Sequence, residues 1–151
     1  MVERAQIEEL VYRSCLALDE RDFKAFLELC DLGFRYKVTA YSPEIRKELV
    51  WLDHDRKGME TLFTNLPRHN SDHAPLTRHA TVYTVKVDGS QAEVVSALQV
   101  FRTALDGGAT ELFAVARLID TIKLDGGSPK LASRVVQIGT RQLGFGSHIP
   151  F

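Results

Sequence analysis

Apolar residues recur at intervals of three and four in three stretches of the chain, at residues 7–18, 23–30 and 59–66. This spacing places the apolar side chains along one face of an α-helix. Asp22 is a candidate N-cap for the second helix, and we expect Pro67 to end the third. The sequence therefore predicts three helices, each with one face directed towards a core.

The other patterned segments are typical of β-strands. Residues 34–41 alternate between polar and apolar positions, and residues 44–52 are expected to return as the hairpin partner. Further segments rich in Val, Thr and aromatic residues follow, separated by glycine-containing turns, at residues 78–87, 93–104, 110–124 and 131–141. Helices followed by a long meander, without βαβ alternation, predict an α+β fold. We expect three helices to cover one face of a strongly curved antiparallel sheet of five to six strands.

Composition and net charge indicate the number of domains and argue against some kinds of partner. The 151 residues are 44% apolar with a formal net charge of -1, which suits a single domain over residues 1–151 and argues against nucleic-acid or anionic-membrane partners. No stretch approaches the ~20 apolar residues of a membrane helix. Cys15 and Cys30 fall in helical patterns and are expected to be buried thiols. We therefore expect an unprocessed cytoplasmic protein.

A cluster of metal-binding residue types lies in the middle of the sequence. It comprises His54, His69, His73, His79, Asp53, Asp55 and Asp72. A two-histidine, one-carboxylate iron site can be drawn from this set. The spacing does not favour it, because His69 and His73 belong to a proline-bounded loop where separation by four does not align two rings. Helix capping and loop hydrogen bonds are the preferred interpretation, and we expect no metal in this chain.

The C-terminal residues 142–151 concentrate apolar side chains between glycines and a proline. This composition neither extends a helix nor forms a regular central strand, and disordered termini rarely contain so many large apolar residues. We expect a docking tail, anchored by Phe145 and Phe151, that contacts its own chain or a neighbouring subunit. The candidate subunit-interface residues are Phe145, His148, Ile149 and Phe151.

The order of these elements resembles the NTF2-like, or SnoaL-like, cone fold over essentially the whole chain. Several irregular stretches resemble the small (beta) subunit of Rieske-type ring-hydroxylating oxygenases, and within that family the methanesulfonate monooxygenase branch. These stretches are residues 40–47, 49–56, 65–70, 77–82 and 143–151.

The resemblance implies a small subunit that forms a homotrimer and supports a large (alpha) subunit. The large subunit would hold a Rieske [2Fe-2S] cluster and a mononuclear iron. A Rieske cluster needs two cysteines and two histidines, and neither Cys15 nor Cys30 has a histidine nearby in the sequence. We therefore expect no cofactor in this chain and a mainly structural role in assembling the catalytic subunits. The substrate stays open between an aromatic acid and a small sulfonate.

A second interpretation makes the chain an enzyme in its own right. Asp19 and His79 match the positions of an Asp and a His in NTF2-like dehydratases such as the scytalone dehydratase group, which the chain resembles here. An enclosed pair could act as a general base without a cofactor, with Tyr12 or Tyr83 nearby. Against this, Asp19 also suits a helix-capping role and His79 an interior role, so no catalytic residue is preferred. A small-ligand-binding cone without chemistry is a third interpretation.

Several strand segments are apolar at consecutive positions, which indicates that both faces of the sheet are covered. The residues are Val94, Val95, Leu98, Val100, Phe101, Phe113, Val115, Leu118 and Ile119. Either a deep core or a partner chain would account for them. Arginines also lie on the predicted strands, where they can form cross-strand ion pairs, contact a partner's carboxylates or face solvent: Arg78, Arg102, Arg117, Arg134 and Arg141.

Overall fold

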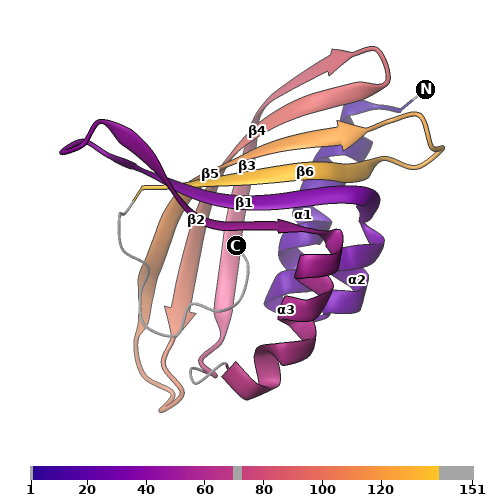
Figure 1. Cartoon of the computed structure of the whole chain (residues 1–151). Helices are drawn as coiled ribbons and strands as arrows, with labels where there is room; N and C mark the ends of the chain where they lie inside the picture. The colour runs from indigo at the N-terminus through magenta and orange to yellow at the C-terminus, as the bar shows by residue number, and fades with distance from the viewer. Residues whose placement is uncertain (1, 70–72, 140–151) are drawn as a thin grey trace.

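The structure is a computed structural model that describes residues 2–69 and 73–139. Three helices pack against one six-stranded curved sheet (Figure 1), in agreement with the expected α+β fold. The elements in chain order are α1 (Arg4–Asp19), α2 (Phe23–Glu28), β1 (Cys30–Ser42), β2 (Lys47–Asp55), α3 (Arg56–His69), β3 (Leu76–Asp88), β4 (Gln91–Thr103), β5 (Thr110–Lys123) and β6 (Lys130–Ile138).

The sheet is mixed and not wholly antiparallel. Its strand order is β2-β1-β6-β5-β4-β3. Four neighbouring pairs are antiparallel, but β1 and β6 run parallel, with Tyr36 beside Arg134 and Val38 beside Val136. The expectation of a purely antiparallel sheet was therefore wrong at this one pairing. Alternation along a strand identifies its buried face but not the direction of its neighbour.

The observed ends of the second and third helices also differ from the predicted ones. Cys30 is the first residue of β1, whereas the sequence pattern placed it at the end of the second helix. Helix α3 continues to His69, so Pro67 does not end it. A proline near a helix C-terminus removes only one intrahelical hydrogen bond. The predicted cap is confirmed, because the Asp22 carboxylate accepts a hydrogen bond from the Ala25 N–H at 3.1 Å.

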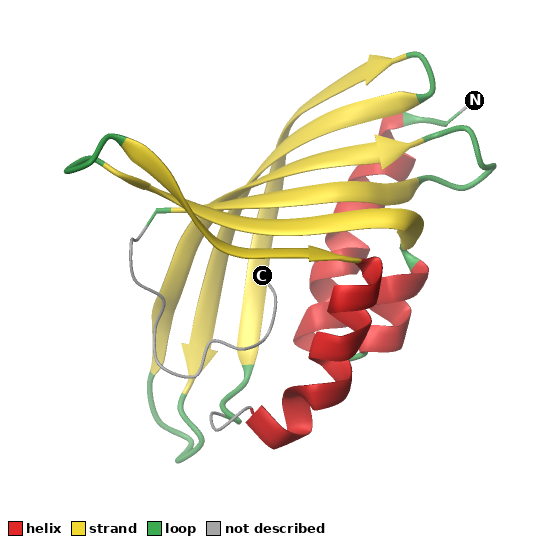
Figure 2. Ribbon diagram, viewed as in Figure 1, coloured by secondary structure: helices red, strands yellow, loops and turns green. Residues whose placement is uncertain are grey.

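All three helices lie on the same side of the sheet (Figure 2), and the core fills the space between them. Helix α1 packs against β3, while α2 and α3 pack against the β1 end of the sheet. Phe26 on α2 contacts both Phe34 and Phe63 edge to face, with ring centroids 6.1 Å and 6.0 Å away. The opposite face of the sheet carries no helix of the described chain. No helix among the described residues is long and apolar enough to span a membrane.

Candidate functional site

The carboxylate of Asp19, at the end of α1, binds Arg78 on β3. Arg78 Nη1 donates a hydrogen bond to Asp19 Oδ1 at 2.8 Å, and the Arg78 backbone N–H donates to both carboxylate oxygens at 3.0 and 3.2 Å. The Arg78 side chain is fully buried. Asp19 therefore connects the first helix to the start of the meander through three hydrogen bonds.

His79 is exposed and lies away from Asp19. Successive side chains of a strand point to opposite faces, so the buried position of Arg78 directs His79 to the helix-free side of the sheet. There its ring lies 5.1 Å from that of Phe101. The structure therefore does not bring Asp19 and His79 together, and the enclosed acid–base pair of the second interpretation is not formed.

The two tyrosines considered with that pair are separated as well. The Tyr12 hydroxyl accepts a hydrogen bond from the Val82 N–H at 3.2 Å, on the helix side of the sheet. Tyr83 is exposed, and the guanidinium of Arg117 lies over its ring at 5.8 Å from the centroid. The four residues of the proposed enzyme site thus fall on two faces of the sheet.

A second polar cluster lies at the centre of the molecule, where it is wholly buried. Arg134 on β6 binds Asp120 on β5 through two hydrogen bonds of 2.7 and 3.0 Å, and it donates a third to Ser14 Oγ on α1 at 2.8 Å. Burial alone would lower the pKa of Arg134, but the charge and hydrogen bonds of Asp120 raise it above its usual value. The guanidinium is therefore a permanent cation that joins two strands and a helix.

The strand arginines divide into several roles. Arg134 pairs across strands as expected but is buried, and Arg102 lies 4.0 Å from Glu111 on the neighbouring strand. Arg78 binds Asp19 at the end of α1, and Arg117 lies over the ring of Tyr83. Arg141 lies outside the described residues. The buried cluster was not singled out from the sequence, although a signal was present. Buried and exposed positions alternate along β5 and β6, and Asp120 and Arg134 occupy buried positions, where an apolar residue is expected.

The two cysteines are free and buried, as expected. Burial raises the pKa of both thiols, that of Cys30 to about 12. The Cys30 thiol also donates a hydrogen bond to the Phe26 carbonyl at 3.3 Å. Because the thiolate is the reactive form, neither side chain is suited to act as a nucleophile.

The histidine cluster of the sequence is dispersed in the fold. His54 is on β2 and His79 on β3, the two outermost strands of the sheet, while the His73 side chain is exposed in the connection before β3. Asp72 and the side chain of His69 lie outside the described residues. Within residues 2–69 and 73–139, no three His, Cys, Asp or Glu side chains are close enough to hold a metal. Asp55 instead accepts a hydrogen bond from the Gly58 N–H at 2.8 Å at the start of α3.

The apolar strand residues fall into two sets on opposite faces. Val94, Leu98, Val100 and Leu118 are buried in the core. Phe113 is half-buried and packs against this core, whereas Val95, Phe101, Val115 and Ile119 are half-buried or exposed on the other face. On the helix-free face, which we call the outer face, Val95 lies opposite Ile119 and Ile119 opposite Val135. The outer face therefore carries an apolar row across three strands, β4, β5 and β6.

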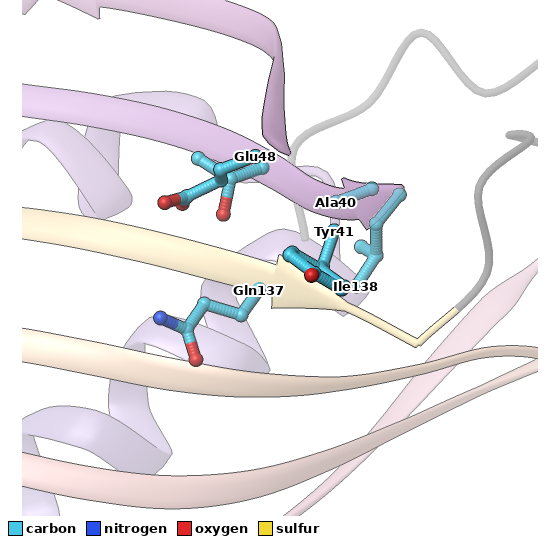
Figure 3. A pocket seen from close by; sticks show the side chains of 6 residues that line it. Ala40, Tyr41, Glu48, Gln137 and Ile138 are labelled. Atoms are coloured by element: carbon cyan, nitrogen blue, oxygen red, sulfur yellow. The ribbon is translucent and has the colours of Figure 1, made fainter. Parts of the chain in front are cut away.

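A shallow pocket of about 280 Å³ lies where β1, β2 and β6 meet (Figure 3). Its polar lining comes from Thr39, Tyr41, Glu48 and Gln137, and Ala40 and Ile138 complete it. Tyr41 pairs with Glu48, and Thr39 with Gln137, across neighbouring strands. It is a surface depression beside the hairpin of β1 and β2, and it contains one carboxylate and no cation.

A family model described as a SnoaL-like domain matches residues 1–135. The chain belongs to this family. It is 39% identical to the methanesulfonate monooxygenase hydroxylase subunit beta of Methylosulfonomonas methylovora, over 95% of this chain and 84% of that protein. It is 29% identical to the 2-aminobenzenesulfonate 2,3-dioxygenase subunit beta of an Alcaligenes species, over 99% of each chain.

Solved structures confirm the cone fold. The beta subunit of benzoate 1,2-dioxygenase from Burkholderia mallei superposes with a TM-score of 0.72 at 15% identity, covering 91% of each chain. The homologues of this chain are thus beta subunits of oxygenases, as the resemblance in the sequence indicated. The tail residues Phe145, His148, Ile149 and Phe151 lie outside the described residues, so their interface role stays a prediction.

Proposed function

We propose that the chain is the small (beta) subunit of a multi-component, Rieske-type oxygenase and that its role is to hold the large subunits in one assembly. The observation that carries this is the 39% identity to an oxygenase hydroxylase beta subunit over 95% of the chain. The geometry supports a structural role. Asp19 is bound to Arg78 and Asp120 to Arg134, so each carboxylate neutralises an arginine inside the fold.

The redox chemistry belongs, in this proposal, to the large (alpha) subunit. That subunit would hold the Rieske [2Fe-2S] cluster and the mononuclear iron, while this chain supplies no ligand to either. The geometry supports this division, because a Rieske cluster needs two cysteines and two histidines, and within the described residues neither Cys15 nor Cys30 belongs to a group of three His, Cys, Asp or Glu side chains that could hold a metal. Free buried cysteines also suit a reducing cytoplasm, where we place the complex.

We propose that the outer face joins copies of this chain into a homotrimer. The apolar row of Val95, Ile119 and Val135 lies on the side of the sheet without helices. Each of these three side chains is half-buried within the single chain. A second copy would remove this apolar surface from water, which is the main driving force of stable association.

The substrate class of the complex is proposed from the curated relatives. Both are named for oxygenation of a sulfonate, one aliphatic and one aromatic. We infer that the oxygenase containing this chain acts on an organosulfonate, with the selecting pocket in the large subunit. The sequence left two substrate classes open, an aromatic acid and a small sulfonate, and the names of these relatives favour the sulfonate.

Co-expression tests the proposal. The partner to co-express would be a large chain with paired Cys/His Rieske spacing, sought first among the genes next to the one for this protein. With a tag on the small subunit only, we expect the large subunit to co-purify in an equimolar complex, measured by size exclusion with light scattering. A monomeric small subunit that fails to retain the large chain would overturn the proposal. Oxygen consumption with methanesulfonate and with benzoate, measured with an electron donor supplied to the complex, would then distinguish the two substrate classes.

A further inference from the structure

Strand β5 extends well beyond the end of its neighbour β6. The two strands pair from Lys123 opposite Lys130 to Ala116 opposite Ile138, where β6 ends. On its other side β5 stays paired with β4 as far as Thr110. Within the described part of the chain, no strand pairs with residues 110–115 on the β6 side. This part of β5 is an open edge that can accept another extended segment.

The open edge is apolar from Leu112 to Val115, next to Glu111, whose side chain is 69% exposed. Leu112 is 54% exposed and Val115 47% exposed. Together with Phe113, Ala114 and Gly139 they line a pocket of about 380 Å³. Exposed edges in monomeric proteins are usually short, charged or covered, and this one carries no charged residue between Leu112 and Val115. Its side chains and its backbone both favour an extended apolar occupant.

The chain leaves the sheet at this same edge. The Gly139 N–H donates a hydrogen bond to the Val115 carbonyl at 2.7 Å. A Cβ at Gly139 would lie only 3.2 Å from that carbonyl oxygen, so glycine permits the close approach. The sequence continues for twelve residues, among them Leu143, Phe145 and Phe151.

We propose that the open edge of β5 is the docking strip for the chain's own C-terminal segment, residues 140–151, with a large apolar side chain of that segment filling the pocket. The C-terminal segment is long enough to cover the strip. Six residues of β5 span about 20 Å at ~3.4 Å per residue. The twelve residues after Gly139 reach at most about 40 Å. Gly139, the residue before the segment, lies beside the strip, so the strip is within reach of the segment.

Limited proteolysis of the isolated chain tests this docking. Chymotrypsin cleaves after Leu and Phe, so cuts after Leu143 or Phe145 report an undocked segment by intact mass. Leu112→Glu places a charge on the strip, and we expect it to speed these cuts about tenfold, which corresponds to ~1.4 kcal/mol in the opening equilibrium. Leu32→Glu is the matched control, because Leu32 is 86% exposed on β1. Equal cleavage of the wild type and Leu112→Glu would overturn the proposal.

Hydrogen exchange gives a second, independent measurement. A chain ended at Gly139 should exchange the amides of residues 112–115 about tenfold faster than the full chain. A synthetic peptide of residues 140–151 should restore their protection. Equal exchange in the two chains would contradict the docking. Both experiments use the small subunit alone, so a failure here leaves the outcome of the co-expression experiment unaffected.

Discussion

Arg78, and not its neighbour His79, is the partner of Asp19. The two residues are 59 positions apart, and three hydrogen bonds of 2.8 to 3.2 Å join them. This contact attaches the C-terminus of α1 to the first residues of β3. It also occupies the carboxylate that a general base would need free, so Asp19 does not offer the free carboxylate that the second interpretation requires.

Asp19→Asn is expected to reduce stability without abolishing oxygenase activity of the assembled complex. The amide keeps the shape but removes the charge opposite the buried Arg78 guanidinium, so the free energy of unfolding should fall by about 1–3 kcal/mol. Urea denaturation measures the change. His79→Gln is the control, because His79 is exposed and should shift stability by less than about 0.5 kcal/mol. Loss of activity in stable, fully assembled Asp19→Asn or His79→Gln complexes would restore the catalytic interpretation.

The buried pair of Asp120 and Arg134 should be the most sensitive polar contact in the described chain. Both side chains are fully buried, and removal of one partner leaves an uncompensated charge. We expect Asp120→Asn to lower the free energy of unfolding by about 3–5 kcal/mol. Guanidinium denaturation followed by circular dichroism would measure it.

The double variant Asp120→Leu with Arg134→Met provides the control for that effect. With both charges gone, the desolvation penalty disappears and apolar packing replaces it. We expect the double variant to be more stable than Asp120→Asn alone. Additive destabilisation in the double variant would show that the two side chains do not act as a pair.

Ile119→Glu should disrupt self-association if the outer face joins copies of the chain. Its side chain lies in the middle of the apolar row, between Val95 and Val135, and a buried unpaired carboxylate is costly in an interface. Light scattering should show a smaller particle. Leu16→Glu, at a residue of α1 that is 55% exposed, should leave the mass unchanged. An unchanged trimer in Ile119→Glu would move the interface to another surface.

Cys30 should make the protein less stable as the pH rises above about 9. Burial raises the pKa of its thiol from 9.0 to about 12 in the folded chain. Between these values the unfolded thiol loses its proton while the folded thiol keeps it, so the free energy of unfolding falls with pH. Cys30→Ala removes this contribution. Its free energy of unfolding should decline less steeply between pH 9 and 11 than that of the wild type; parallel slopes would contradict the assignment.

Much of the fold could be predicted from the sequence, because the helices and strands have clear periodicity. Residues 7–18 fall within α1, and the glycine-containing turns separated β3, β4 and β5 correctly. The parallel neighbour of β1 could not be predicted. Each strand carries its own pattern of buried and exposed positions, but strand direction in the sheet depends on how separate segments of the chain pack together.

The candidate site was harder to predict for a related reason. A one-residue step along β3 exchanges the inner and outer faces, so a sequence that contains both Arg78 and His79 does not show which one meets Asp19. The apolar positions on both faces of β4 and β5 predicted a covered outer face; in the described chain no helix lies over this face and Val115 is exposed, so its cover by a partner chain stays a prediction. Asp120 and Arg134 each stand at an inward position that the strand pattern could have revealed, but their pairing follows only from the registers of β5 and β6.

The position of β6 bears on the order in which the sheet can be completed during synthesis. This strand, the last in the described part of the chain, lies between β1 and β5, and through Arg134 it reaches Ser14, 120 residues earlier. The hairpin of β1 and β2 and the meander of β3 to β5 therefore emerge with no strand between them. Until β6 is synthesised, the edges of β1 and β5 that it joins have no partner among the described strands, and an incomplete sheet with open edges is prone to aggregation.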